Sequence, residues 1–139
     1  MSSNPLDAFE LEACIGVGGR AEVWRGYHRL QRHPVAVKLI TSGSSLSASA
    51  REAFRNEVRA VAGLNHPNII DVFDYGEVDS ALAQVSGGRF QAGGLFLVME
   101  LAPDGTLVPC CGQISWSAFR QVMRSLLEAL AHAHGLTVG

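Results

Sequence analysis

The chain opens with an alternation of apolar and polar residues. Over residues 9–15 the apolar positions recur at every second residue, which is the pattern of a half-buried β-strand. A glycine-rich stretch at 16–19 follows directly, and the alternation resumes over residues 21–27. We therefore predict two strands joined as a hairpin by a glycine-rich loop.

A third strand is predicted over residues 34–40. It places Ala36 and Lys38 on one face, because side chains two apart in a strand point the same way. Serine and other small residues at 41–50 then predict a linker. A helix is predicted to follow over residues 51–64.

The predicted helix has two distinct faces. Its apolar stripe is made by three residues, Phe54, Val58 and Val61. A second face, expected to be solvated, carries Arg51, Arg55 and Arg59. Glu57 borders the stripe, and a buried carboxylate needs a partner, as does a lysine in an apolar strand. We expect Glu57 to pair with Lys38, while the alternatives are an exposed Glu57 or a pair with a neighbouring arginine.

The middle of the chain predicts two more strands and their connections. Proline and asparagine at 65–68 indicate a turn, and residues 69–75 have the composition of a strand. Residues 77–94 contain two Gly-Gly pairs and are expected to form a long, mobile hairpin connection without a function of its own. The apolar run at 95–99 is typical of a buried strand. Proline and glycine within 100–107 predict a connector between two structural units.

Ser115 is a candidate N-cap for a final helix that runs to about His134. Helical spacing of apolar residues predicts a buried stripe along it, made by Phe119, Val122, Met123, Leu126, Leu127 and Leu130. His132 and His134 are two positions apart, so they point about 200° from one another and are not expected to bind a metal together.

Composition narrows the class of protein. The 139 residues are 47% hydrophobic, which suits one small globular domain, and the formal net charge of -2 disfavours nucleic acid and anionic membranes as partners. No apolar run approaches the roughly 18 to 20 residues of a membrane span, and the start lacks signal-peptide features. A cytoplasmic location is therefore expected. Cys14, Cys110 and Cys111 lack the spacing of a zinc site or disulfide framework and are expected to be reduced thiols.

The glycine-rich stretch and the strand that follows it suggest phosphate binding. Gly16, Gly18 and Gly19 let a backbone turn lie close to phosphate oxygens, and Lys38 adds a positive charge. A Rossmann turn would start a helix and a P-loop would end in Gly-Lys-Ser/Thr, so neither fits. With Ala21 at the third glycine position and Val-Ala-Val-Lys ending at Lys38, the pattern resembles the small lobe of a protein kinase. The resemblance extends over residues 9–134 and is closest to bacterial Ser/Thr kinases.

The resemblance implies an α+β fold. A twisted antiparallel sheet of about five strands would carry helix C, and a hinge would lead to a truncated helical large lobe. Residues 1–8 would be an N-terminal tail, 9–102 the small lobe and 103–139 the hinge exit with the start of the large lobe. The implied partners are ATP, with Mg²⁺ in the family, and a protein substrate.

The resemblance also implies an ATP-binding set. Its members are Ile15, Gly16, Gly18, Gly19, Val23, Ala36, Lys38, Met99, Glu100, Ala102 and Thr106. The glycines would cover the phosphates, while Val23 and Ala36 would pack on the adenine. Lys38 would hold the α- and β-phosphates and pair with Glu57 of helix C. Met99 would guard the back of the adenine pocket, residues 100–102 would form the hinge, and Thr106 would lie near the ribose.

The catalytic motifs of the family do not occur in these 139 residues. Without His-Arg-Asp and Asp-Phe-Gly, neither a catalytic aspartate nor a magnesium ligand is assigned. We expect weak ATP binding and little or no kinase activity from this chain alone, either as a truncated product or as part of a longer sequence. The alternatives are a nonenzymatic nucleotide-binding or kinase-docking module and a degenerate remnant. Both could use an exposed helix 116–134 to bind a partner protein or to self-associate.

Overall fold

The computed structural model describes residues 5–19, 21–40, 47–85 and 88–135. The strands are β1 (Phe9–Val17), β2 (Ala21–His28), β3 (Pro34–Ile40), β4 (Val72–Glu77) and β5 (Leu95–Glu100). The helices are α1 (Ala48–Ala62), α2 (Ser80–Val85) and α3 (Trp116–Ala133), with short 3-10 turns η1 (Pro5–Ala8) and η2 (Val108–Cys110).

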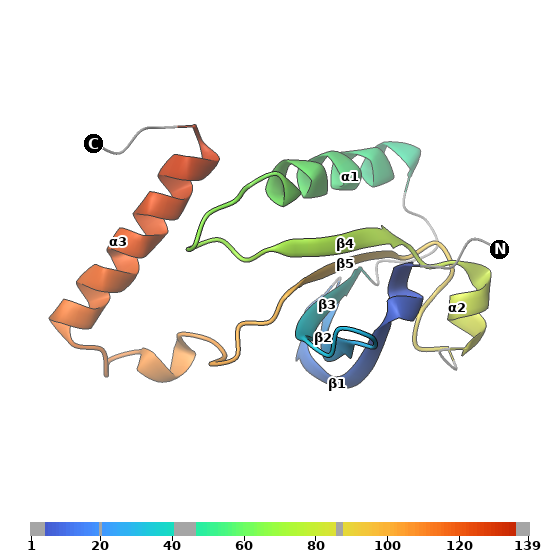
Figure 1. The fold of residues 1–139 in the computed structure, drawn as a ribbon, viewed down its shortest axis with the longest axis horizontal. Coiled ribbons are helices and arrows are strands. Elements are labelled where there is room, and N and C mark those ends of the chain that lie inside the picture. Colours follow the sequence, from blue (N-terminus) through green and yellow to red (C-terminus); the bar gives the residue numbers. More distant parts are fainter. Residues whose placement is uncertain (1–4, 20, 41–46, 86–87, 136–139) are drawn as a thin grey trace.

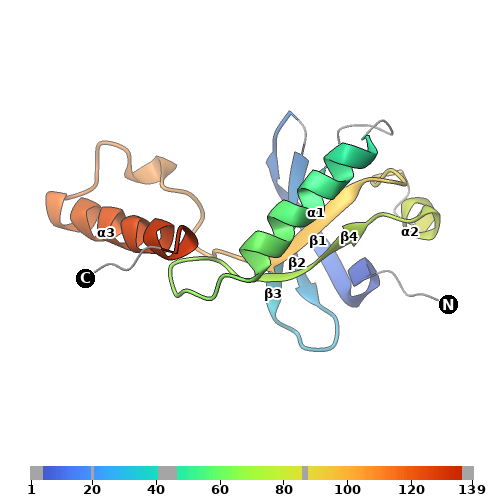
Figure 2. The same ribbon diagram turned by 90° about the horizontal axis from the view of Figure 1, so that it is seen from above.

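The five strands form one antiparallel sheet in the order β1-β2-β3-β5-β4. Helix α1 runs beside β4, and α3 stands to one side of the sheet (Figures 1 and 2). The prediction of an α+β fold with a five-stranded antiparallel sheet is confirmed.

The hydrophobic core lies on one face of the sheet. Alternation on β3 turns Val35, Val37 and Leu39 toward this face, where each is at most 4% exposed. The remaining members of the cluster come from η1, β1, β5 and the residue after β4, and they are Leu6, Phe9, Phe96, Val98 and Val78. Burial of Leu6 shows that the predicted tail at 1–8 contributes to the core through η1.

The connection between β4 and β5 contains a helix that the sequence did not predict. Helix α2 begins after Asp79, whose Oδ1 accepts a hydrogen bond from the Leu82 amide (2.7 Å). Leu82, Ala83 and Phe90 are half-buried against the core cluster. The expectation of a connection without regular structure is therefore wrong at α2, because its apolar residues cover the buried face of the sheet.

Element boundaries otherwise shift by a few residues. Strand β4 begins at Val72 and not at residue 69, because the turn continues to Ile69, whose amide donates to the His66 carbonyl (3.1 Å). Helix α1 begins at Ala48 with Ser47 as its N-cap. The expected linker at 41–50 lies mostly outside the described residues.

Helix α3 begins as predicted, since the Ser115 hydroxyl accepts a hydrogen bond from the Ala118 amide (3.2 Å). The predicted burial of its apolar stripe is wrong. Its large side chains are between 37% and 59% exposed at Phe119, Met123, Leu126, Leu127 and Leu130. The helix meets the rest of the described chain mainly at the turn after α1, where Asn68 Nδ2 donates to the Ser125 carbonyl (3.1 Å). Within the described ranges, no helix is both long and apolar enough to span a membrane.

Candidate functional site

The glycine-rich hairpin between β1 and β2 has an open tip. The Gly18 amide donates to the Ala21 carbonyl (2.8 Å), which closes the turn. Gly18 and Gly19 are exposed, and a Cβ added at Gly19 would meet nothing within 4 Å. Arg20 lies outside the described residues. The tip therefore leaves room for a ligand next to the backbone.

Lys38 lies at the centre of the sheet, on the face opposite the core. Direct pairing aligns four side chains across neighbouring strands, in the order Val23, Lys38, Leu97 and Tyr75. Directly paired residues in an antiparallel sheet share a face, so these side chains form one row. The row starts beside the hairpin, because Val23 is itself paired with Gly16.

A second row on the same face is apolar at its centre. Ala36 is paired with Met99, and both positions lie two residues from the Lys38–Leu97 pair. The structure thus brings the glycine hairpin, one cation and an apolar surface together. Ile15 is less well placed, since it falls in a register shift of β1 and is 51% exposed.

Lys38 is half-buried and has no ion pair among the residues that the structure describes. Glu57 is exposed on α1, and no ion pair joins it to Lys38 in this part of the chain. The Lys38–Glu57 pair therefore stays a prediction. An unpaired cation on a partly covered face favours an anionic ligand.

Each arginine on this side of α1 has a polar partner on β4. Arg51 Nη1 lies 2.9 Å from Glu77 Oε1, and Arg55 Nη2 lies 3.8 Å from Glu77 Oε2. Arg59 Nε donates a hydrogen bond to the Tyr75 hydroxyl (3.3 Å). The expectation of a solvated arginine face holds for Arg55 and Arg59, which are exposed. It is wrong for Arg51, which is half-buried because Glu77 projects from β4 toward it. Sequence patterns missed both partners, since neither lies near the arginines in the chain.

The exit of β5 is fixed by two hydrogen bonds between Glu100 and Asp71. The Glu100 amide donates to the Asp71 carbonyl (2.8 Å), and Glu100 Oε2 accepts from the Asp71 amide (3.2 Å). Ala102 and Thr106 follow on the exposed connection that leads to η2 (Figure 1). Thr106 Oγ1 accepts a bond from the Val108 amide (3.4 Å), so its hydroxyl is partly engaged.

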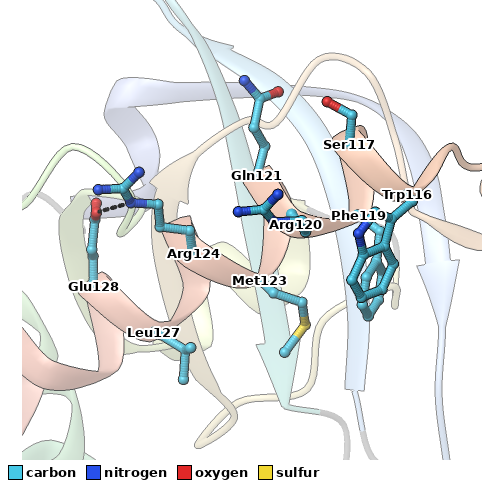
Figure 3. Close-up of a pocket in the computed structure, with 9 residues that line it drawn as sticks. All are labelled: Trp116, Ser117, Phe119, Arg120, Gln121, Met123, Arg124, Leu127 and Glu128. Carbon is cyan, nitrogen blue, oxygen red and sulfur yellow. Dashed lines mark ion pairs between the residues drawn. The ribbon is translucent and has the colours of Figure 1, made fainter.

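A separate apolar surface runs along α3. It borders a hollow of about 690 Å³, and Trp116, Phe119, Met123 and Leu127 project to one side of the helix (Figure 3). The Trp116 and Phe119 rings are stacked with centroids 5.7 Å apart. Sequence periodicity found this surface and predicted it to be buried, with an exposed helix 116–134 as the alternative.

A family model for the protein kinase domain matches residues 9–138. The chain belongs to the protein kinase family. The resemblance noted from the glycine hairpin and the Lys38 strand is thereby confirmed, together with the bacterial Ser/Thr type of kinase.

Bacterial relatives of this kinase chain cover most of its length. The serine/threonine-protein kinase PknA of Mycobacterium tuberculosis is 35% identical over 133 residues, which is 92% of this chain and 29% of PknA. The probable serine/threonine-protein kinase PknB of Corynebacterium glutamicum is 33% identical over 117 residues, or 76% of this chain and 18% of PknB. The chain therefore spans less than a third of the length of these relatives.

The residues on the Lys38 face suit the phosphate groups and the base of the nucleotide that protein kinases use. An unpaired cation and an open glycine turn suit phosphate groups, and the pair of Ala36 and Met99 suits a flat apolar ring. The described residues do not supply a metal site. In the described ranges, no three His, Cys, Asp or Glu side chains are grouped so that they could hold a metal ion.

Proposed function

We propose that this chain binds ATP on the Lys38 face, as the nucleotide-binding part of a Ser/Thr protein kinase. The observation that carries the proposal is the position of Lys38. It is half-buried, has no ion pair among the described residues, and lies in one row with Val23 beside the glycine hairpin. A cation in this setting gains more from a phosphate group than an exposed cation does.

Each part of the face has a role in this proposal. Backbone amides of the hairpin 16–19 approach the phosphates, and Lys38 contacts the α- and β-phosphates. Ala36 and Met99, with Val23 and Ile15, pack against the adenine. The backbone at 100–102 contacts the edge of the base, and Thr106 lies toward the ribose. A cytoplasmic location, where ATP is supplied, is part of the proposal.

Phosphoryl transfer itself requires groups that these 139 residues do not contain. Neither His-Arg-Asp nor Asp-Phe-Gly occurs in the sequence, and these motifs position the substrate hydroxyl and the metal ions in the family. Mg²⁺, when bound with ATP, neutralises phosphate charge, and we assign no residue of this chain to it. We therefore expect little or no transfer to protein Ser or Thr from this chain by itself.

Thermal unfolding with and without Mg-ATP tests the proposal. At a ligand concentration tenfold above Kd, binding stabilises the folded state by about 1.4 kcal/mol, which raises the Tm by a few degrees. We expect this rise in the wild-type protein and in Arg29→Met, which removes a cation at the end of β2. Lys38→Met should lose it. A rise that is equal in Lys38→Met would remove Lys38 from the site, and no rise in any variant would contradict ATP binding.

A second candidate function is protein docking through the apolar surface of α3. The specific observation is the exposure of Phe119, Met123 and Leu127 together with Trp116, which is 71% exposed. A contiguous apolar surface of this kind marks sites of association with another protein or a second copy. This function requires no nucleotide and is compatible with the first.

A further inference from the structure

The connection between β4 and β5 is fastened to the sheet at its base. The Val78 amide donates to the Gly94 carbonyl (2.7 Å), and the Gly93 amide donates to the Val78 carbonyl (2.8 Å). From this base, Leu82 of α2 and Phe90 pack against the core cluster. The connection therefore lies over the face of the sheet opposite Lys38, and it reaches β2 in space.

Arg89 makes the contact with β2. Its guanidinium carbon lies 5.8 Å from the centre of the Trp24 ring, within the range of a cation–π interaction. Trp24 Nε1 in turn donates a hydrogen bond to Glu22 Oε2 (3.1 Å). Trp24 is half-buried and packs against the core cluster, so the indole ring is held on both sides.

Glu22 stands at the end of β2 that enters the glycine hairpin. It is paired with Val17, and the next pair along the ladder is Val23 with Gly16. Holding Glu22 and Trp24 therefore restrains the strand from which the hairpin tip projects. Local sequence patterns do not predict the contact between Arg89 and Trp24, because Arg89 lies more than sixty residues after the hairpin.

Arg89 also borders two hollows on this face, both of which Phe90 borders as well. One of about 210 Å³ is bordered by Glu22, and the other of about 400 Å³ is bordered by Trp24 and Arg29. Removing the guanidinium would enlarge the 400 Å³ hollow that Trp24 borders. The ring would then have fewer neighbours to hold it in place.

We infer that Arg89 is a positioning residue for the glycine-rich hairpin, acting through Trp24 and Glu22 from the opposite face of the sheet. Only the consequence for nucleotide affinity rests on the proposed ATP binding. The consequence for the hairpin itself is independent of any ligand.

Amide hydrogen exchange tests the inference in the absence of nucleotide. We expect Arg89→Ala to speed exchange in peptides covering residues 16–24 by roughly two- to fivefold, the value of an exposed cation–π contact. Arg89→Lys keeps a cation and should restore most of the protection. Arg29→Ala is the matched control, because Arg29 borders the same 400 Å³ hollow but makes no ring contact with Trp24 among the described residues.

Unchanged exchange in Arg89→Ala, or an equal increase in Arg29→Ala, would overturn the inference. Arg89 is exposed, so Arg89→Ala and Arg89→Lys should keep the Tm of the parent protein within a few degrees. If the wild type binds Mg-ATP, Arg89→Ala should raise its Kd by the same roughly two- to fivefold. If no variant binds ATP, the proposed function fails, while the exchange data still decide the role of Arg89.

Discussion

At Gly26 a missing side chain allows β1 and β2 to approach each other. A Cβ built at this buried position would collide with the carbonyl oxygen of Glu10 on β1. The obstacle is backbone, which cannot move aside as a flexible side chain can. Glycine is therefore required here by space and not by backbone conformation.

Gly26→Ala should destabilise the fold. Forcing an extra methyl group against backbone typically costs about 1–3 kcal/mol, and urea unfolding of the variant measures the cost. Gly19→Ala is the control, because a Cβ at Gly19 has nothing within 4 Å and should change the free energy of unfolding by less than about 0.5 kcal/mol. Equal stability of the two variants would contradict the packing described for β1 and β2.

Single residues also show what the sequence could predict of the candidate site. Alternation was enough to place Ala36 and Lys38 on one face, because the period of a strand is fixed by its backbone. The partner of Lys38 is a different problem. Glu57 is exposed in the structure, and its distance from Lys38 depends on how α1 is turned against β4. That rotation is set by contacts such as Arg51 with Glu77, which local patterns do not encode.

Among the elements, the strands were predicted well and helix α2 was missed. Alternation and apolar runs identified all five strands of the sheet, with the start of β4 displaced by the turn before it. Helix α2 has only six residues, which is too short for a helical period to stand out. Its position depends on covering the core face, and that is a tertiary effect.

Helix α3 illustrates a second limit of sequence patterns. Periodicity identifies an apolar stripe, but burial of the stripe depends on which element packs against it. The sequence of the helix does not specify that element. In the described part of the chain, the polar contacts of α3 with the turn at 65–68 involve Asn68, which donates to the Ser125 carbonyl. These polar contacts leave the apolar stripe of α3 exposed to solvent.

Association through α3 should therefore depend on its apolar side chains. We expect the average mass from light scattering to rise with protein concentration in the wild type. Leu127→Glu should lower this association, because it places a charge on an apolar contact surface. Gln121→Glu is the control, since Gln121 projects away from Met123 and Leu127 (Figure 3). A wild-type protein that stays monomeric at every concentration would contradict self-association.

In the molecule as a whole, the sheet carries the candidate nucleotide site and α3 carries a separate apolar surface. The core face holds η1, α2 and the β4–β5 connection, while the opposite face presents Lys38 and receives α1 near β4. The two faces are coupled at β2, where Trp24 is on one side and Val23 on the other. This arrangement explains how the contact of Arg89 with Trp24 on the core face can position the glycine-rich hairpin that borders the Lys38 face.

Lys38 is the only lysine in the sequence, which permits a direct test of ATP binding. An ATP analogue with an acyl group on its terminal phosphate transfers that group to a nearby amine, forming an amide and releasing the nucleotide. Mass spectrometry then locates the label. We predict acylation of Lys38 that is suppressed by excess ATP. Labelling confined to the N-terminal amine, or labelling of Lys38 that excess ATP leaves unchanged, would contradict a nucleotide site on this face.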